Sequence, residues 1–67
     1  MTLSGLTWRA DSPSLLHLTT APVAIGYDGR AWLIHLAGQW GTREFRTRDE
    51  AAALVATAFT NARENLG

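Results

Sequence analysis

The feature that most constrains the fold is the stretch of residues 23–36, which reads VAIGYDGRAWLIHL. Side chains alternate on both sides of Asp28 and Gly29, and this pattern predicts two antiparallel strands. Asp-Gly favours a two-residue type I′ turn, whose central residues both take positive φ. The resulting register pairs Ile25 with Trp32. One face then carries the large side chains of Val23, Ile25, Tyr27, Trp32, Ile34 and Leu36.

A further strand is expected on each side of this hairpin. Residues 14–20, SLLHLTT, alternate, and a tight turn at residues 20–21 would place Leu16 opposite Ile25. A long bent strand from Leu15 through residue 22 is the alternative. After a loop over residues 37–41, the segment 42–46 predicts a short strand that places Phe45 opposite Trp32.

The C-terminal third has the pattern of an amphipathic helix over residues 48–65. Thr47 and Glu50 have the spacing of a capping box, in which Thr47 is the N-cap. The apolar stripe has the i, i+3, i+4 spacing of a buried face, and we expect that Phe59→Ala or Trp32→Ala unfolds the domain. The stripe consists of Ala51, Leu54, Val55, Ala58, Phe59, Ala62 and Leu66.

These elements predict one α+β domain spanning residues 1–67. We expect an antiparallel meander of three to four strands, with one C-terminal helix packed on one face. Residues 1–12 remain open: they fit a frayed arm, a short edge strand, or a flap in which Trp8 covers one end of the core. A chain of this length buries only about 60% of its unfolded surface, so the core needs most of its large apolar residues.

The residue types argue against an enzyme. The chain has no cysteine and only two histidines, His17 and His35, whose separation matches no metal motif. Ser14, His17 and Asp11 are close in sequence, but such proximity is not a catalytic triad. We therefore expect no catalytic residues, no metal site and no cofactor.

Charge and hydropathy limit the cellular locations and the classes of binding partner that we expect. The chain has neither the features of a secretory signal nor an apolar run of about 20 residues, so a cytoplasmic location is expected. The formal net charge is zero, with six basic residues that are all arginine. Zero charge disfavours nucleic-acid binding and leaves self-association open, through a sheet edge or a leucine-bearing face.

The sheet face away from the helix is the expected binding site. One helix covers only one face, so Leu15, His17, Leu33 and His35 would lie on an uncovered surface. Trp40 stands in a Gly-flanked loop, and Trp and Arg are enriched at binding hot spots. We expect this surface to dock on a larger protein or ribonucleoprotein. Its candidate residues are Leu33, His35, Trp40, Arg43, Glu44 and Arg46.

The segment from Trp32 onward also matches a known pattern. A strand, a turn, a short strand ending in Phe-x-Thr and a helix beginning Glu-Ala follow in order, through Gly41, Phe45, Thr47, Glu50 and Ala51. Residues 32–59 thereby resemble the sheet-plus-helix DNA-binding domains of the APETALA and ethylene-response type and of integrase arm-binding domains.

The resemblance implies that the sheet enters the major groove and that arginines clamp the DNA. The arginines in question are Arg30, Arg43, Arg46 and Arg48.

The size and style of the chain are instead similar to phage accessory proteins, including anti-CRISPR inhibitors. The leading hypothesis is therefore a small non-enzymatic protein-binding module, such as an inhibitor of a host complex. A sheet-reading DNA-binding domain is the alternative, and a homodimer is compatible with either.

Overall fold

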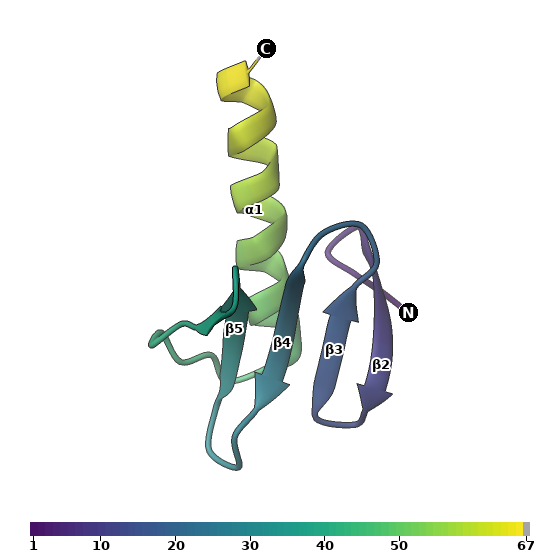
Figure 1. Ribbon diagram of the computed structural model, residues 1–67, viewed down its shortest axis with the longest axis vertical. Coiled ribbons are helices and arrows are strands. Elements are labelled where there is room, and N and C mark those ends of the chain that lie inside the picture. Colours follow the sequence, from purple (N-terminus) through teal and green to yellow (C-terminus); the bar gives the residue numbers. More distant parts are fainter. Residues whose placement is uncertain (67) are drawn as a thin grey trace.

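The fold is an antiparallel meander with a single C-terminal helix (Figure 1). The computed structural model describes residues 1–66, and the side chains of residues 1–62. The strands are β1 (Thr2–Leu3), β2 (Leu6–Ser12), β3 (Leu15–Leu18), β4 (Val23–Tyr27), β5 (Trp32–Leu36) and β6 (Gln39–Trp40), and the helix is α1 (Arg48–Leu66). Strand order in the sheet equals chain order. The expected α+β architecture is confirmed, but six strands replace the predicted three to four.

The first twelve residues form two strands of this sheet. Ser4 and Gly5 take φ of 53° and 77°, which gives β1 and β2 the tight turn that pairs adjacent strands. β2 then pairs with β3 and places Trp8 opposite Leu18. Trp8 is only 1% exposed, so this segment supplies the centre of the core rather than a frayed arm.

The pairing of β3 with β4 follows the predicted register. Leu16 lies opposite Ile25, and both side chains are buried on the helix side of the sheet. Residues 19–22 form bends between the two strands. The alternative of one long bent strand through residue 22 is therefore wrong.

The central hairpin is shifted by two residues from the predicted register. Tyr27, rather than Ile25, lies opposite Trp32, so the connection has four residues instead of two. The cause is the Asp28 side chain, whose Oδ1 accepts hydrogen bonds of 2.8 Å from two backbone N–H groups, those of Arg30 and Ala31. Because the shift is even, the side chains stay on their predicted faces.

A two-residue turn with positive φ occurs instead between β5 and β6. Its residues are Ala37 and Gly38, with φ of 54° and 81°. This turn creates β6 in the segment that the sequence predicted as a loop. The strand predicted over residues 42–46 reduces to a single bridge, in which Phe45 lies opposite Trp32 as expected.

The helix begins where the capping box predicted. The Glu50 N–H donates to Oγ1 of Thr47 at 3.2 Å. The Glu50 carboxylate accepts from the backbone N–H of Arg46, one residue before the N-cap, at 3.2 Å. The first bond satisfies an N–H group that a helix start leaves without an intrahelical partner, and the second ties the residue before the N-cap to the first turn.

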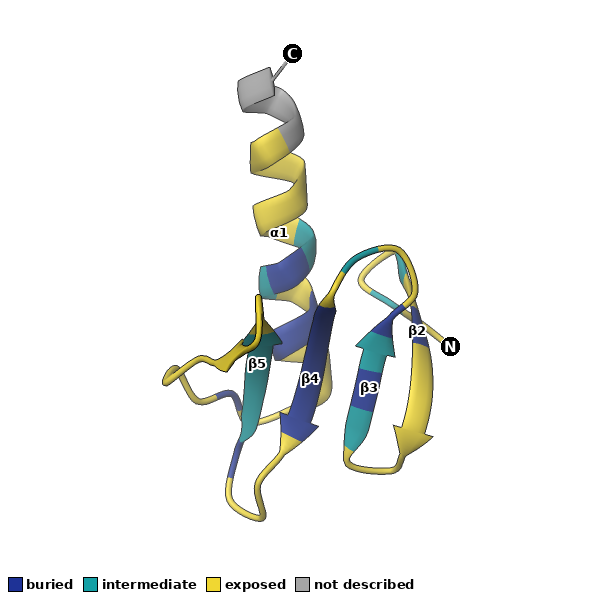
Figure 2. Ribbon diagram, viewed as in Figure 1, coloured by how far each residue is buried: buried dark blue, intermediate teal, exposed yellow. Residues whose placement is uncertain are grey.

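The core lies between the helix and one sheet face (Figure 2). The buried residues are Trp8, Leu16, Leu18, Val23, Ile25, Phe45, Ala51, Ala52 and Val55. Ala51 and Ala52 are fully buried, and such small side chains let the helix approach the sheet closely.

The second half of the predicted apolar stripe does not reach this core. The helix runs past the end of the sheet, so Ala58, Phe59 and Ala62 are exposed (Figures 1 and 2). Phe59 is 36% exposed, and the expectation that Phe59→Ala unfolds the domain is corrected accordingly. The side chain of Leu66, the last predicted member of the stripe, lies outside the described residues.

Candidate functional site

The sheet face opposite the helix is covered by no other element of the described chain, and we call it the open face. Strand alternation places on it residues from β2 to β6. Its members are Arg9, Asp11, Leu15, His17, Ala24, Gly26, Leu33, His35 and Trp40.

Two rows of directly opposed residues cross the open face. The first row runs Arg9, His17, Ala24, His35 and Trp40 from β2 to β6. Ala24 lies between the two histidines. Its small side chain is only 3% exposed, so it projects less from the sheet than the histidine rings do.

The second row is apolar over three strands and ends at Ser12 of β2, which lies opposite Leu15. It runs Leu15, Gly26 and Leu33 from β3 to β5. On this face β4 carries only Ala24 and Gly26, so it projects less from the sheet than β3 and β5 do. The open face is therefore a shallow trough with larger side chains on both sides.

The Trp40 ring fills the Gly26 end of this trough. The turn that creates β6 folds its ring back over the sheet, where it meets His35 edge-on with ring centroids 4.9 Å apart. The ring also covers Gly26, where an added Cβ would lie 2.8 Å from Cη2 of Trp40. The residue nevertheless remains 51% exposed, and it presents an aromatic surface to solvent.

A hollow of about 420 Å³ lies beside the Trp40 ring. Leu15, Gly26, Leu33 and Trp40 supply its apolar lining. Its polar lining comes from Ser12, Ser14 and Asp28. A concave apolar site with a few polar groups at its rim is typical of binding sites for side chains or small ligands.

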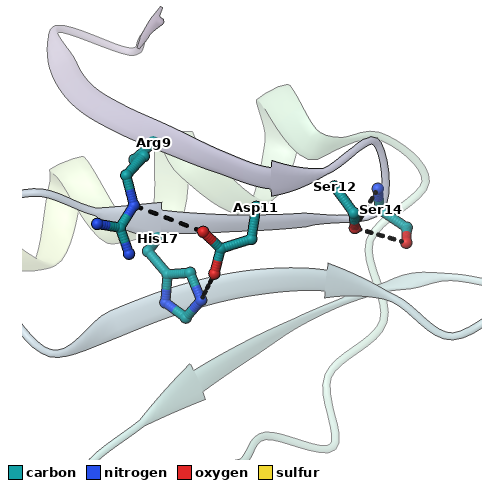
Figure 3. Close-up of polar contacts among 5 residues, drawn as sticks. All are labelled: Arg9, Asp11, Ser12, Ser14 and His17. Carbon is teal, nitrogen blue, oxygen red and sulfur yellow. Dashed lines mark hydrogen bonds and ion pairs between the residues drawn. The ribbon is translucent and has the colours of Figure 1, made fainter.

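A polar cluster occupies the β2–β3 side of the open face (Figure 3). The Asp11 carboxylate contacts His17 Nε2 at 2.7 Å and Arg9 Nε at 3.5 Å. Ser14 contacts Ser12 instead, with 3.4 Å between the hydroxyl oxygens, at the end of the hairpin away from His17 (Figure 3). Of the three residues Ser14, His17 and Asp11, the structure thus joins only the last two. These side chains are more than a third exposed, so their contacts add little stability.

The structure separates the six predicted binding residues into two groups. Leu33, His35 and Trp40 lie together on the open face. The other three, Arg43, Glu44 and Arg46, lie in the segment between β6 and α1; Arg43 and Glu44 have side-chain contacts, whereas Arg46 contacts Glu50 through its backbone N–H.

The Arg43 and Glu44 side chains contact different parts of the chain. The guanidinium carbon of Arg43 lies 5.2 Å from the Phe45 ring centroid. Glu44 forms an ion pair with Arg30 of the central hairpin loop. Arg9 and Arg30 thus each have a carboxylate partner, which offsets their charge.

The sequence prediction missed the contribution of β2. Arg9 and Asp11 lie on the open face because Leu6, Trp8 and Ala10 face the other side. That alternation was visible in the sequence, but Gly5 and Pro13 on either side of it obscured the strand.

Two further features of the described residues concern metals and membranes. No group of three or more His, Asp or Glu side chains within this part of the chain is arranged to hold a metal ion. Over the same residues, α1 lacks the combination of length and apolarity that a bilayer crossing requires.

Comparisons with protein-family models, with curated proteins and with solved structures found no match for this chain.

Proposed function

We propose that this chain is a small non-enzymatic protein-binding module that docks on a larger protein or ribonucleoprotein through the open face. The observation that carries the proposal is the placement of Trp40, which is half exposed, packs against His35 and Gly26, and lies next to an apolar hollow. Trp is enriched among residues that dominate binding energy, and a ring already packed against the sheet has less conformational entropy to lose on binding than a free one.

The rest of the open face has the composition of an interface. Leu33 provides apolar contact at the centre, and the polar cluster of Arg9, Asp11 and His17 lies on one side. Protein interfaces combine such an apolar centre with a polar rim. The similarity in size to phage inhibitors makes a host complex the first partner to examine.

Paired capture experiments test this proposal. Immobilised wild-type protein, Trp40→Ala and Leu33→Asp are exposed to extract from the native host, with Thr60→Glu on the exposed side of the helix as the matched control. We expect a partner that the wild type and the control retain and that both open-face variants lose. With the purified partner, Trp40→Ala should weaken the affinity by about 30-fold or more, as hot-spot truncations do. Equal retention by all four folded proteins would contradict the proposal.

The same proteins distinguish DNA binding, which is the alternative. A DNA-binding sheet should lose affinity steeply with added salt and should depend on Arg46 or Arg48. We expect no salt-sensitive mobility shift, since Arg9 is paired with Asp11 and Arg30 with Glu44. A shift that Arg46→Ala abolishes and Trp40→Ala preserves would favour the alternative.

A further inference from the structure

The hollow beside Trp40 lies at the end of the open face where two loops meet. The β2–β3 and β4–β5 connections emerge at the same end of the sheet (Figure 1). The backbone N–H of Tyr27 donates to the Ser14 carbonyl at 2.9 Å, which ties these two connections together. The hollow therefore has a rim of loop residues beside an apolar lining from the strands. The rim residues are Ser12, Ser14 and Asp28.

The charge in this hollow has a single sign. Of the described residues that line it, Asp28 alone is charged at neutral pH. The backbone N–H groups of Ala31 and Arg30 donate to its Oδ1, both at 2.8 Å, and lower the pKa of the carboxyl group. The positive charge of Arg30 adds to this lowering, but its guanidinium is paired with Glu44 and does not line the hollow. The hollow therefore presents an ionised carboxylate beside an aromatic ring.

The Asp28 carboxylate also has acceptor capacity to spare. A carboxylate offers about four acceptor positions, and both backbone hydrogen bonds end on Oδ1. These bonds leave the positions on Oδ2 for an incoming donor. The hydroxyl oxygens of Ser12 and Ser14 on the same rim can accept as well. The polar side of the hollow thus suits a ligand group that is cationic and has several N–H donors.

We propose that the hollow binds an arginine side chain of the partner protein, with the guanidinium between the Trp40 ring and the Asp28 carboxylate. This inference rests on the proposed function, because it names the side chain that the partner places on the open face. Leu15 and Leu33 would contact the methylene stem, which arginine buries readily along apolar surfaces. The planar guanidinium would stack on the indole and donate to the carboxylate at the same time.

Other partner side chains fit the hollow less well. A lysine ammonium is more strongly hydrated and lacks the flat surface that stacks on Trp40. A carboxylate would be repelled by Asp28, and a purely apolar side chain would leave the Asp28 charge without a partner. Charge complementarity therefore favours arginine.

Peptide titrations of the full chain, followed by NMR, test the inference without the partner. The probes are a blocked Gly-Arg-Gly tripeptide and the same peptide with citrulline or lysine in place of arginine, each added up to about 20 mM. We expect the arginine peptide to shift the Trp40 indole N–H and the Leu15 and Leu33 amides, with a dissociation constant of about 1–10 mM. The citrulline peptide, whose urea group is uncharged, should bind about fivefold more weakly or worse.

Variants locate the binding in the hollow. Asp28→Asn should weaken arginine binding about threefold or more, and an asparagine oxygen can still accept the two backbone N–H groups that hold the loop. Trp40→Ala should weaken it by a similar factor. The matched control is Asp11→Asn, which removes the same charge from the same face outside the hollow and should bind like the wild type.

Three results would overturn the inference. One is equal affinity for the arginine and citrulline peptides, and another is equal loss of affinity in Asp28→Asn and Asp11→Asn. The third is a lysine peptide that binds as tightly as the arginine peptide, because the site would then not select a guanidinium.

The inference and the proposed function fail separately. If the wild type captures a partner that Trp40→Ala loses, but the arginine peptide does not bind, the inference fails and the proposed function stands. If the arginine peptide binds in the hollow but Trp40→Ala retains the partner, the proposed function fails and the hollow remains an arginine site.

Discussion

The indole of Trp40 rests directly on Gly26, since a Cβ atom at position 26 would lie 2.8 Å from Cη2 of the ring. This contact joins β6 to β4 across the open face and depends on the absence of a side chain. Trp40 therefore owes its position to a glycine fourteen residues earlier in the chain.

Gly26→Ala should displace the Trp40 ring without unfolding the domain. The new methyl group collides with the far end of a half-exposed side chain, which can rotate away, whereas the backbone at Gly26 is not in the left-handed region. We expect the indole N–H resonance of Trp40 to shift in NMR spectra while that of buried Trp8 stays in place. Unchanged Trp40 signals, assigned with Trp40→Phe, would show that the ring does not lie over Gly26.

Trp8 and Trp40 should respond differently to truncation. Trp8 is 1% exposed, and removal of a buried Trp costs about 3–5 kcal/mol, which is most of the stability of a domain this small. We expect Trp8→Ala to lose its cooperative thermal transition, whereas Trp40→Ala, 51% exposed in the wild type, should lose about 1 kcal/mol. Similar melting curves for the two variants would contradict the position of β2 in the core.

Asp28 should make stability depend on acid pH. The backbone N–H groups of Ala31 and Arg30 donate to its carboxylate and lower its pKa. A lowered folded-state pKa means that the stabilisation is complete above the unfolded pKa of about 4 and is lost as the pH falls through the folded value. In urea unfolding, the stability advantage of the wild type over Asp28→Asn should shrink between about pH 5 and pH 2. A difference that is constant with pH would exclude this role.

Thr47→Ala should weaken the helix start. The substitution removes the acceptor of the Glu50 N–H, and loss of such an N-cap costs about 0.5–2 kcal/mol. Urea unfolding measures this loss against Thr60→Ala, an exposed helix position that should change stability by no more than about 0.5 kcal/mol. Equal effects of the two substitutions would show that Thr47 does not cap the helix.

The sequence predicted the layers of this fold well because they depend on periodicity. Alternation fixed the faces of β3, β4 and β5, and the capping box located the first turn of α1. The facing of Phe45 and Trp32 was also predicted correctly, since it follows from the same alternation.

The turns explain why the hairpin register and some of the strands were predicted incorrectly. Asp28 and Gly29 suggested a type I′ turn, but the Asp28 side chain binds two N–H groups and stabilises a longer loop. Turns with positive φ formed instead at Ser4-Gly5 and Ala37-Gly38, and they created strands that the sequence reading had left undecided or assigned to a loop. Local residue preferences alone do not decide between such neighbouring turns.

The candidate site was predicted only in part for the same reason. Leu33 and His35 are on the open face because of alternation, which the sequence displays. Trp40 joins them only because the Ala37-Gly38 turn folds β6 back against β5. The length of the helix beyond the sheet, which exposes Phe59, follows from tertiary packing and not from the helical pattern.

The affinity of the purified partner for wild-type protein and for Trp40→Ala, measured side by side by calorimetry, tests the open-face proposal most directly. We expect the substitution to weaken binding by about 30-fold or more while Thr60→Glu binds like the wild type. Equal affinities of the wild type and a folded Trp40→Ala variant would contradict the role of the open face.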